Sequence, residues 1–312
     1  MQNLTLSFNI IFPLFLLMVL GFFLKSVGML DEITLKKINS LIFKVCLPCL
    51  IFYNVYASEI SDMFDKRLVI FSVVSVVASF LVLLVVIPII EKDNKKRGVI
   101  IQGIFRSNFV IFGIPLSVAL YGDGIVGSAA VLIAIVVPVF NFLAVLTLEI
   151  FRGGKPDMAK IAKGIATNPL VIASLAGLAA MVVGLRLHST IEKAVGDVSR
   201  ITTPLALIVL GGSMDLKKIG GNAKQLAISV LGRLVLVPCL FLPLAVYFGF
   251  RNAELAILLS LFASPTAVSS FSMAQQMGGD DELAGQIVVF NTSLCVVTVF
   301  LWIFILKQIG VM

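Results

Sequence analysis

The feature that most constrains this chain is a series of long apolar segments that fill almost its whole length. A helix that crosses a lipid bilayer needs about 20 mostly apolar residues. The sequence predicts ten such segments, near residues 8–25, 36–57, 67–90, 98–120, 124–151, 158–184, 191–213, 223–249, 252–277 and 282–307. Of all residues 59% are hydrophobic and only 13% are charged, unlike the usual composition of a soluble domain. We therefore expect an all-α integral membrane protein with ten transmembrane helices.

Lysine and arginine are distributed unevenly between the predicted connections. With the N-terminus outside, the inside connections carry 14 of these residues, including Lys155, Lys217 and Lys218, whereas the outside connections and tail carry 6. Positively charged loops remain cytoplasmic, so the split predicts a multi-pass protein of the cell membrane with both termini outside. Topology and anionic lipid account for the net charge of +7, which therefore does not indicate a nucleic-acid partner.

The chain also contains an internal repeat. Eight of the 11 prolines form four ordered pairs between the two halves, namely Pro13 with Pro169, Pro48 with Pro204, Pro88 with Pro238, and Pro115 with Pro265. The tripeptide VFN at 139–141 recurs at 289–291. We expect a first five-helix repeat over 1–151, a short cytoplasmic connection over 152–157, and a second repeat over 158–312. Because five is odd, the second repeat would be inverted, as in many secondary transporters.

The stretch LLSLFASPTAVSSFSMA predicts a broken helix. Pro265 lacks an amide hydrogen and clashes with the carbonyl of Leu261, so the helix must kink or break there. Ser264 would then cap a second half-helix that has Pro265 at its first position. Gly113 and Pro115 are expected to mark the matching break. Unpaired backbone groups are costly in lipid, so the two broken helices should meet in the interior, where their N-termini would bind an anion.

Several motifs resemble the auxin efflux carrier family. They are NFVIFGIPL with Asn108, LEIFRGGK, ATNPLVIASLAG and ASPTAVSSFSMAQQMGGDDELAGQIV, and the likeness covers essentially the whole chain. The resemblance implies two inverted repeats, with helices 4 and 9 crossing at their prolines. It also implies a scaffold of helices 1, 2, 6 and 7, a transport bundle of helices 3–5 and 8–10, elevator or rocking motion, and a homodimer through the scaffold. Bacterial members are associated with malonate, malate and similar carboxylates, and the short connection favours this compact type.

The candidate substrate-binding residues are amides, hydroxyls and residues of the breaks: Asn108, Gly113, Pro115, Asn141, Ser264, Pro265, Thr266 and Asn291. The alternative for the polar ones is capping or hydrogen bonding between helices. The candidate charge or gating residues are Lys44, Arg106 and Arg200. The alternatives for them are snorkelling to the interface, structural pairing or, for Arg200, an ion pair with Asp197. Arg233 is ambiguous in the same way.

The function that these features predict is secondary transport of a small organic anion, a mono- or dicarboxylate, across the membrane. An anion or small-solute channel is the alternative, and an intramembrane enzyme is less favoured because no nucleophile with a nearby base is recognisable. No cofactor and no resident metal are expected. A proton or sodium ion could be coupled to transport, and backbone carbonyls at the helix breaks could bind sodium.

Overall fold

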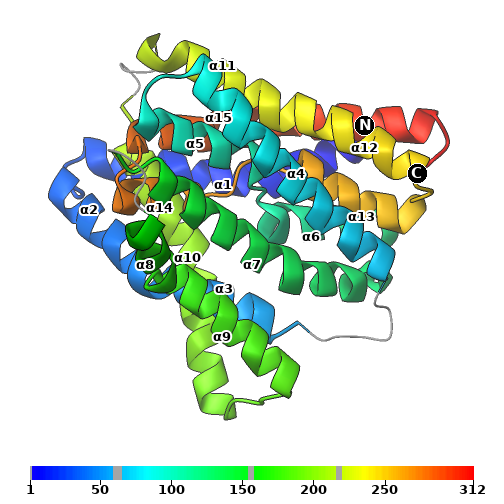
Figure 1. Cartoon of the computed structure of the whole chain (residues 1–312), viewed down its shortest axis with the longest axis horizontal. Helices are drawn as coiled ribbons and strands as arrows, with labels where there is room; N and C mark the ends of the chain where they lie inside the picture. The colour runs from blue at the N-terminus through cyan, green and yellow to red at the C-terminus, as the bar shows by residue number, and fades with distance from the viewer. Residues whose placement is uncertain (1, 59–64, 154–157, 216–219) are drawn as a thin grey trace.

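The computed structural model describes residues 2–58, 65–153, 158–215 and 220–312. This part of the chain is helical, with one isolated β-bridge between Ser107 and Thr266 (Figure 1). Residues 154–157 of the predicted connection, including Lys155, lie outside the described residues, as do Lys217 and Lys218.

The helices along the chain are α1 (Gln2–Ser26), α2 (Glu32–Leu41), α3 (Leu47–Tyr56), α4 (Lys66–Ile90), α5 (Asn94–Phe105), α6 (Ile114–Tyr121), α7 (Val126–Ile150), α8 (Met158–Ala166), α9 (Pro169–Val183), α10 (Ser189–Ser213), α11 (Ala223–Leu231), α12 (Val237–Tyr247), α13 (Asn252–Ala263), α14 (Ser269–Met277) and α15 (Asp281–Gln308). Three π-helical turns lie between them, η1 (Ile42–Cys46), η2 (Phe109–Gly113) and η5 (Gly232–Leu236), and η3 (Asp123–Ile125) is a short 3₁₀ turn.

Within the described residues, six helices are long and apolar enough to cross a membrane, and a seventh span results if the bent pair α8 and α9 is counted as one. The chain is therefore a multi-pass membrane protein. Three of the ten predicted segments contain shorter apolar helices, Phe12–Ser26, Phe109–Tyr121 and Asn252–Ala263. Two of these are short because the helix is interrupted. The arrangement as ten inverted spans remains a prediction.

Each π-turn ends two residues before a proline, at Pro48, Pro115 and Pro238. A proline ring clashes with the carbonyl four residues earlier and gives it no helical donor, and here that carbonyl always belongs to the central residue of the π-turn. The wider turn accommodates the ring without ending the helix. At Pro238 the freed carbonyl of Leu234 accepts a hydrogen bond from Trp302 Nε1 over 3.2 Å.

This accommodation overturns the predicted break at Gly113 and Pro115. Pro115 is the second residue of α6, and the helix runs on from η2 into α6. The interruption instead comes earlier, at Arg106–Asn108, where Arg106 has an extended backbone with φ −87° and ψ 117°. This stretch contains no proline or glycine, so the interruption depends on the residues that pack against it.

The second interruption is at Pro265, as predicted, and it pairs with the first. The Asn108 N–H donates to the Pro265 carbonyl over 2.8 Å, and the Ala267 N–H donates to the Arg106 carbonyl over 3.4 Å. Ser107 and Thr266 therefore lie opposite each other in an antiparallel bridge. We call residues 106–108 and 264–268 together the crossing. Each broken segment replaces lost helical bonds with bonds to the other, which explains why both stay extended.

The prediction that Ser264 caps the second half-helix is wrong. Ser264 ends α13, and its hydroxyl donates back to the Ser260 carbonyl. α14 begins only at Ser269, and its N-cap residue Val268 forms no side-chain cap. Pro265 is therefore part of the extended segment rather than the first residue of the second half-helix. Ser264 helps to satisfy the carbonyl end of α13.

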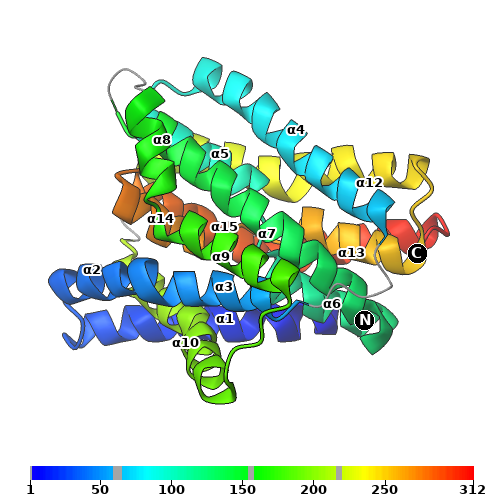
Figure 2. The same cartoon turned by 60° about the horizontal axis from the view of Figure 1, so that its bottom comes forward.

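The chain termini lie at one end of the molecule, whereas α2 and α14 lie at the other end in both views (Figures 1 and 2). At that second end, α8 and α9 meet at 55° in a bend that we call the elbow. Asn168 accepts from the Leu170 N–H at the start of α9 and donates to Met277 Sδ of α14 over 3.6 Å.

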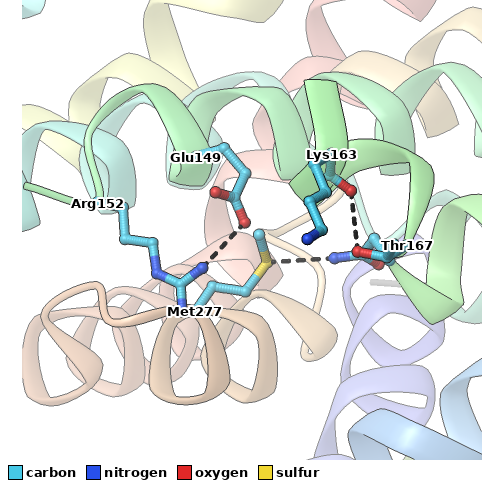
Figure 3. A network of polar contacts seen from close by, with 6 residues as sticks. Glu149, Arg152, Lys163, Thr167 and Met277 are labelled. Atoms are coloured by element: carbon cyan, nitrogen blue, oxygen red, sulfur yellow. Dashed lines mark hydrogen bonds and ion pairs between the residues drawn. The ribbon is translucent and has the colours of Figure 1, made fainter. Parts of the chain in front are cut away.

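The end of α7 supports the same elbow (Figure 3). Glu149 pairs with Arg152 over 3.4 Å, and its carboxylate packs so closely on Gly164 of α8 that an added Cβ would lie 2.6 Å from Glu149 Cδ. The elbow and the end of α7 thus lie beside the far end of α14.

Candidate anion-binding site

A cavity of about 70 Å³ lies beside the crossing. Its walls come from α3 and α10, from α7, and from the crossing, η2 and the start of α14. The polar residues that line it are Asn54, Arg106, Ser107, Asn108, Asn141, Thr202, Thr203 and Ser269, and the remaining lining residues are apolar.

Arg106 is the only charged residue in this lining and is only 4% exposed. Its Nη2 donates to Asn141 Oδ1 over 2.7 Å, and its Nη1 contacts the thioether Sδ of Met273 at 2.6 Å. A thioether is a weak acceptor. No carboxylate of the described residues pairs with Arg106. The protein thus holds a cation in its interior without an anionic partner, which is costly unless a ligand supplies the missing charge.

Asn108 lies two residues further along the same wall. It is 5% exposed, and its Nδ2 donor has no partner among the described residues. The Ser107 hydroxyl between them is also buried without a partner. A guanidinium, an amide N–H and a hydroxyl therefore lie in consecutive residues of the cavity wall. All three are donors that a carboxylate oxygen accepts.

Backbone donors add to this set. The N–H groups of Val110 and Ile111 at the start of η2, and of Val268 and Ser269 at the start of α14, have no hydrogen-bond partner within the described chain. All four residues line the cavity. Helix N-termini carry about half a positive charge and favour anions, so both broken spans contribute positive potential to the cavity.

The opposite side of the crossing satisfies the helix C-termini. Arg233, 1% exposed, donates to carbonyls of both first half-helices. Its Nε and Nη2 reach Ser264 O and Leu261 O over 2.7 and 2.8 Å, and its Nη1 reaches Ile104 O and Phe105 O over 3.2 and 3.4 Å. Leu261 O is the carbonyl that Pro265 deprives of its helical donor.

Two side chains complete this side. Thr266 Oγ1 donates to Gly103 O over 2.5 Å and accepts from Asn291 Nδ2 over 2.7 Å. The last four carbonyls of α5 are therefore all satisfied. Gln102 O accepts from the Arg106 N–H, Gly103 O accepts from Thr266, and the last two accept from Arg233. The crossing therefore separates the helix ends by polarity. Carbonyl ends lie on the Arg233 side, and amide ends lie on the cavity side.

The predicted site residues divide accordingly. Arg106, Asn108 and Asn141 line the cavity. Ser264, Pro265, Thr266 and Asn291 build the crossing but do not line the cavity. Gly113 is buried where a Cβ would lie 2.6 Å from Phe109 and 3.1 Å from Ser260, so it permits close packing.

The other predicted residues lie outside the cavity lining. Pro115 and Lys44 are exposed, and Arg200 is exposed and pairs with Asp197 over 3.2 Å. The alternative of an Asp197 pair is therefore the contact that the structure contains. These exposed positions give Lys44 and Arg200 no contact with the candidate site.

Sequence reasoning missed the polar residues of the other wall, Asn54, Thr202 and Thr203. Nothing in the sequence pairs any of these three residues with the crossing. The sequence leaves Arg233 ambiguous between a charge role and structural pairing. The described residues contain no cluster of three or more His, Cys, Asp or Glu side chains that could hold a metal ion.

Comparison with known proteins gives consistent results. A family model described as "Membrane transport protein" matches residues 6–167 and 157–303. An uncharacterized transporter of Methanocaldococcus jannaschii is 24% identical over 305 residues, covering 96% of this chain and 98% of that protein. A Rhizobium meliloti protein named "Putative malonate transporter" is 24% identical over 302 residues, covering 93% of each chain. An uncharacterized transporter of Methanothermobacter thermautotrophicus is 22% identical over 301 residues, covering 95% and 97%.

Proposed function

The chain belongs to the membrane transport protein family, that of the auxin efflux carriers, and on this premise we propose that it is a secondary transporter of a small carboxylate. The carboxylate binds at Arg106 and Asn108 in the cavity beside the crossing. Among the candidate sites in the described chain, this one combines a buried cation with unused donors from side chains and backbone.

The observation that carries the proposal is the state of Arg106. A buried arginine that meets only one strong acceptor has unused N–H groups and an unneutralised charge. A carboxylate forms two parallel hydrogen bonds with a guanidinium. It would neutralise Arg106 and accept from Asn108 Nδ2, whose donor is otherwise unused.

The size of the cavity limits the ligand. A water molecule occupies about 10–15 Å³ by the same kind of measure, so a cavity of about 70 Å³ accommodates roughly five to seven water-sized groups. A three-carbon dicarboxylate is of this size. The similarity to the Rhizobium meliloti protein named for malonate supports malonate as the first compound to test, with malate and small monocarboxylates beside it.

The mechanism that we propose is alternating access. In it, ten spans form two inverted repeats, helices 1, 2, 6 and 7 form a scaffold, and the crossing moves with the remaining helices. The cavity fits this division, since α3 and α10 supply one wall and the crossing and α7 supply the other. We place the protein in the cell membrane with both termini outside, as the lysine and arginine distribution predicts. Self-association through the scaffold, and coupling to protons or sodium, are part of the same proposal.

Counterflow in proteoliposomes tests the proposal. Vesicles that contain unlabelled malonate should accumulate labelled malonate transiently and saturably, and the excess should disappear when internal malonate is omitted. Arms with and without sodium, and with and without a pH gradient, would identify the coupling ion. Single-channel currents without saturable counterflow would support the channel alternative instead. If no carboxylate is exchanged or conducted, the assignment of an anion substrate is wrong.

A further inference from the structure

A second cavity lies at the other end of α14 and takes no part in the site described above. It has a volume of about 190 Å³. Its walls carry charges of both signs and come from the ends of α1, α2 and α10 and from α14 and the start of α15. The polar lining residues are Lys25, Glu32, Lys36, Ser213, Asp215, Gln275, Asp281 and Glu282.

The short helix α14 connects the two cavities. Its first residue, Ser269, lines the cavity beside the crossing, and Gln275 lines the second cavity. Between them, the hydroxyls of Ser270 and Ser272 are buried and have no hydrogen-bond partner among the described residues, and the same holds for Oδ1 of Asn39 on α2. A polar group that stays buried and unpaired costs free energy that an apolar side chain would not. The cost of these unpaired polar groups is offset if water reaches them in another state of the protein.

Asn39 of α2 closes the path at its far end. Its Nδ2 donates to Gln275 Oε1 over 2.8 Å and to the Ser272 carbonyl over 3.5 Å, and so joins α2 to α14. Gln275 Nε2 in turn donates to Asp281 Oδ2 over 2.9 Å. The bond between Asn39 and Gln275 is neutral on both sides. Such a bond contributes little net free energy, so the contact can break and form again during a transport cycle.

The segment that carries Gln275 is bounded at both ends by non-helical backbone. The crossing precedes α14, and Gly278 follows it in the left-handed conformation at φ +80°. α14 is nine residues long. A short helix with a backbone break at each end can shift as a unit without deforming its neighbours.

We propose that the second cavity is a vestibule that leads from one surface of the membrane to the anion site, and that the contact of Asn39 with Gln275 and α14 is its gate. When the gate opens, Ser272 and Ser270 line the path between vestibule and site. This inference rests on the proposed function for the identity of the solute, but the gate itself is tested without any solute.

Thiol accessibility provides the test. Ser272→Cys is introduced into the full-length protein in lipid vesicles, and its modification by a charged methanethiosulfonate reagent is followed by peptide mass spectrometry, which separates residue 272 from the four native cysteines. Modification should be slow with the gate intact. It should be at least about fivefold faster after Asn39→Ala, which removes the hydrogen bonds of Asn39 Nδ2 to Gln275 Oε1 and to the Ser272 carbonyl. Gln275→Ala removes only the bond between the two side chains and should accelerate modification by about fivefold.

Ser72→Cys on α4 is the matched control, because Ser72 is equally buried and its hydroxyl also lacks a partner. Its modification rate should not respond to either gate variant. The inference is overturned if Ser272→Cys is no faster in both gate variants, or if Ser72→Cys accelerates equally, since the variants would then loosen the whole fold. Accessibility that responds in a protein without carboxylate counterflow would keep the gate and reject the substrate.

Discussion

The two buried arginines at the crossing differ in what surrounds them. Arg233 donates to four backbone carbonyls from both broken helices and has the environment of a structural cation. Arg106, on the other side of the same crossing, donates to one amide oxygen and meets a thioether. Both are almost fully buried. Burial alone therefore does not distinguish the two arginines. They differ in the number and strength of the hydrogen-bond acceptors around each guanidinium.

Helix polarity explains why the two sides differ. A break exposes carbonyls at the end of the first half-helix and amide groups at the start of the second. In this protein the carbonyls of both spans face Arg233 and Thr266, and the free amides lie at the cavity. One arginine therefore completes the fold, and the other keeps a charge that no carboxylate of the described residues neutralises.

The largest expected effect is that of Arg233→Met on stability. Four carbonyls would lose their charged donor inside the membrane, and each unpaired buried group is costly. We expect the free energy of unfolding to fall by at least about 3 kcal/mol, measured as a loss of folded protein and a lower thermal midpoint in detergent. Equal stability of Arg233→Met and wild type would show that Arg233 is not the cap we describe.

Arg106→Gln should give the opposite phenotype. The protein should stay folded, because it loses only one strong hydrogen bond, whereas the Kd for carboxylate should rise by about 100-fold, as expected for a lost charge-assisted pair. Isothermal titration calorimetry measures this Kd. Lys44→Gln removes the same charge at an exposed position outside the cavity and should leave the Kd unchanged. A similar loss in both variants would mean that net charge, rather than contact, controls binding.

Asn108→Ala should weaken binding less, by about tenfold, because it removes one neutral donor to the carboxylate. Asn291→Ala is the informative partner, since Asn291 supports Thr266 from outside the cavity. It should lower the thermal midpoint with little change in the Kd. Reversal of these two effects would move the ligand to the other side of the crossing.

The smallest effect is expected for Arg200→Gln. The ion pair with Asp197 spans 3.2 Å, and the Arg200 side chain is 76% exposed. Exposed pairs contribute little, so stability should change by no more than about 0.5 kcal/mol, and counterflow should be unaffected. A clear transport defect would restore the gating role that its position within a predicted span suggested.

The sequence predicted the helical membrane class, because apolar segments of spanning length leave few alternatives. It also predicted the break at Pro265, and three of its candidate site residues, Asn108, Asn141 and Arg106, line the cavity. It misplaced the other break, since it treated Pro115 and Pro265 as equivalent. Pro115 follows a π-turn that absorbs the proline, whereas the real interruption at Arg106–Asn108 contains neither proline nor glycine.

That interruption is held by groups far away in the chain, which explains why local sequence could not reveal it. The Pro265 carbonyl, Thr266 and Arg233 replace the hydrogen bonds that the helix gives up. The other cavity wall was missed for the same reason, because Asn54 and Thr203 approach the crossing only through tertiary packing. Matching positions of prolines therefore do not locate a break, because hydrogen-bond partners decide where a helix stops.

A structure determined with malonate bound tests the central claim most directly. The account predicts density for the carboxylate within hydrogen-bond distance of the Arg106 guanidinium and Asn108 Nδ2, with the four carbonyl contacts of Arg233 unchanged. Density on the Arg233 side of the crossing, or in the cavity with Arg106 still held only by Asn141 and Met273, would contradict it.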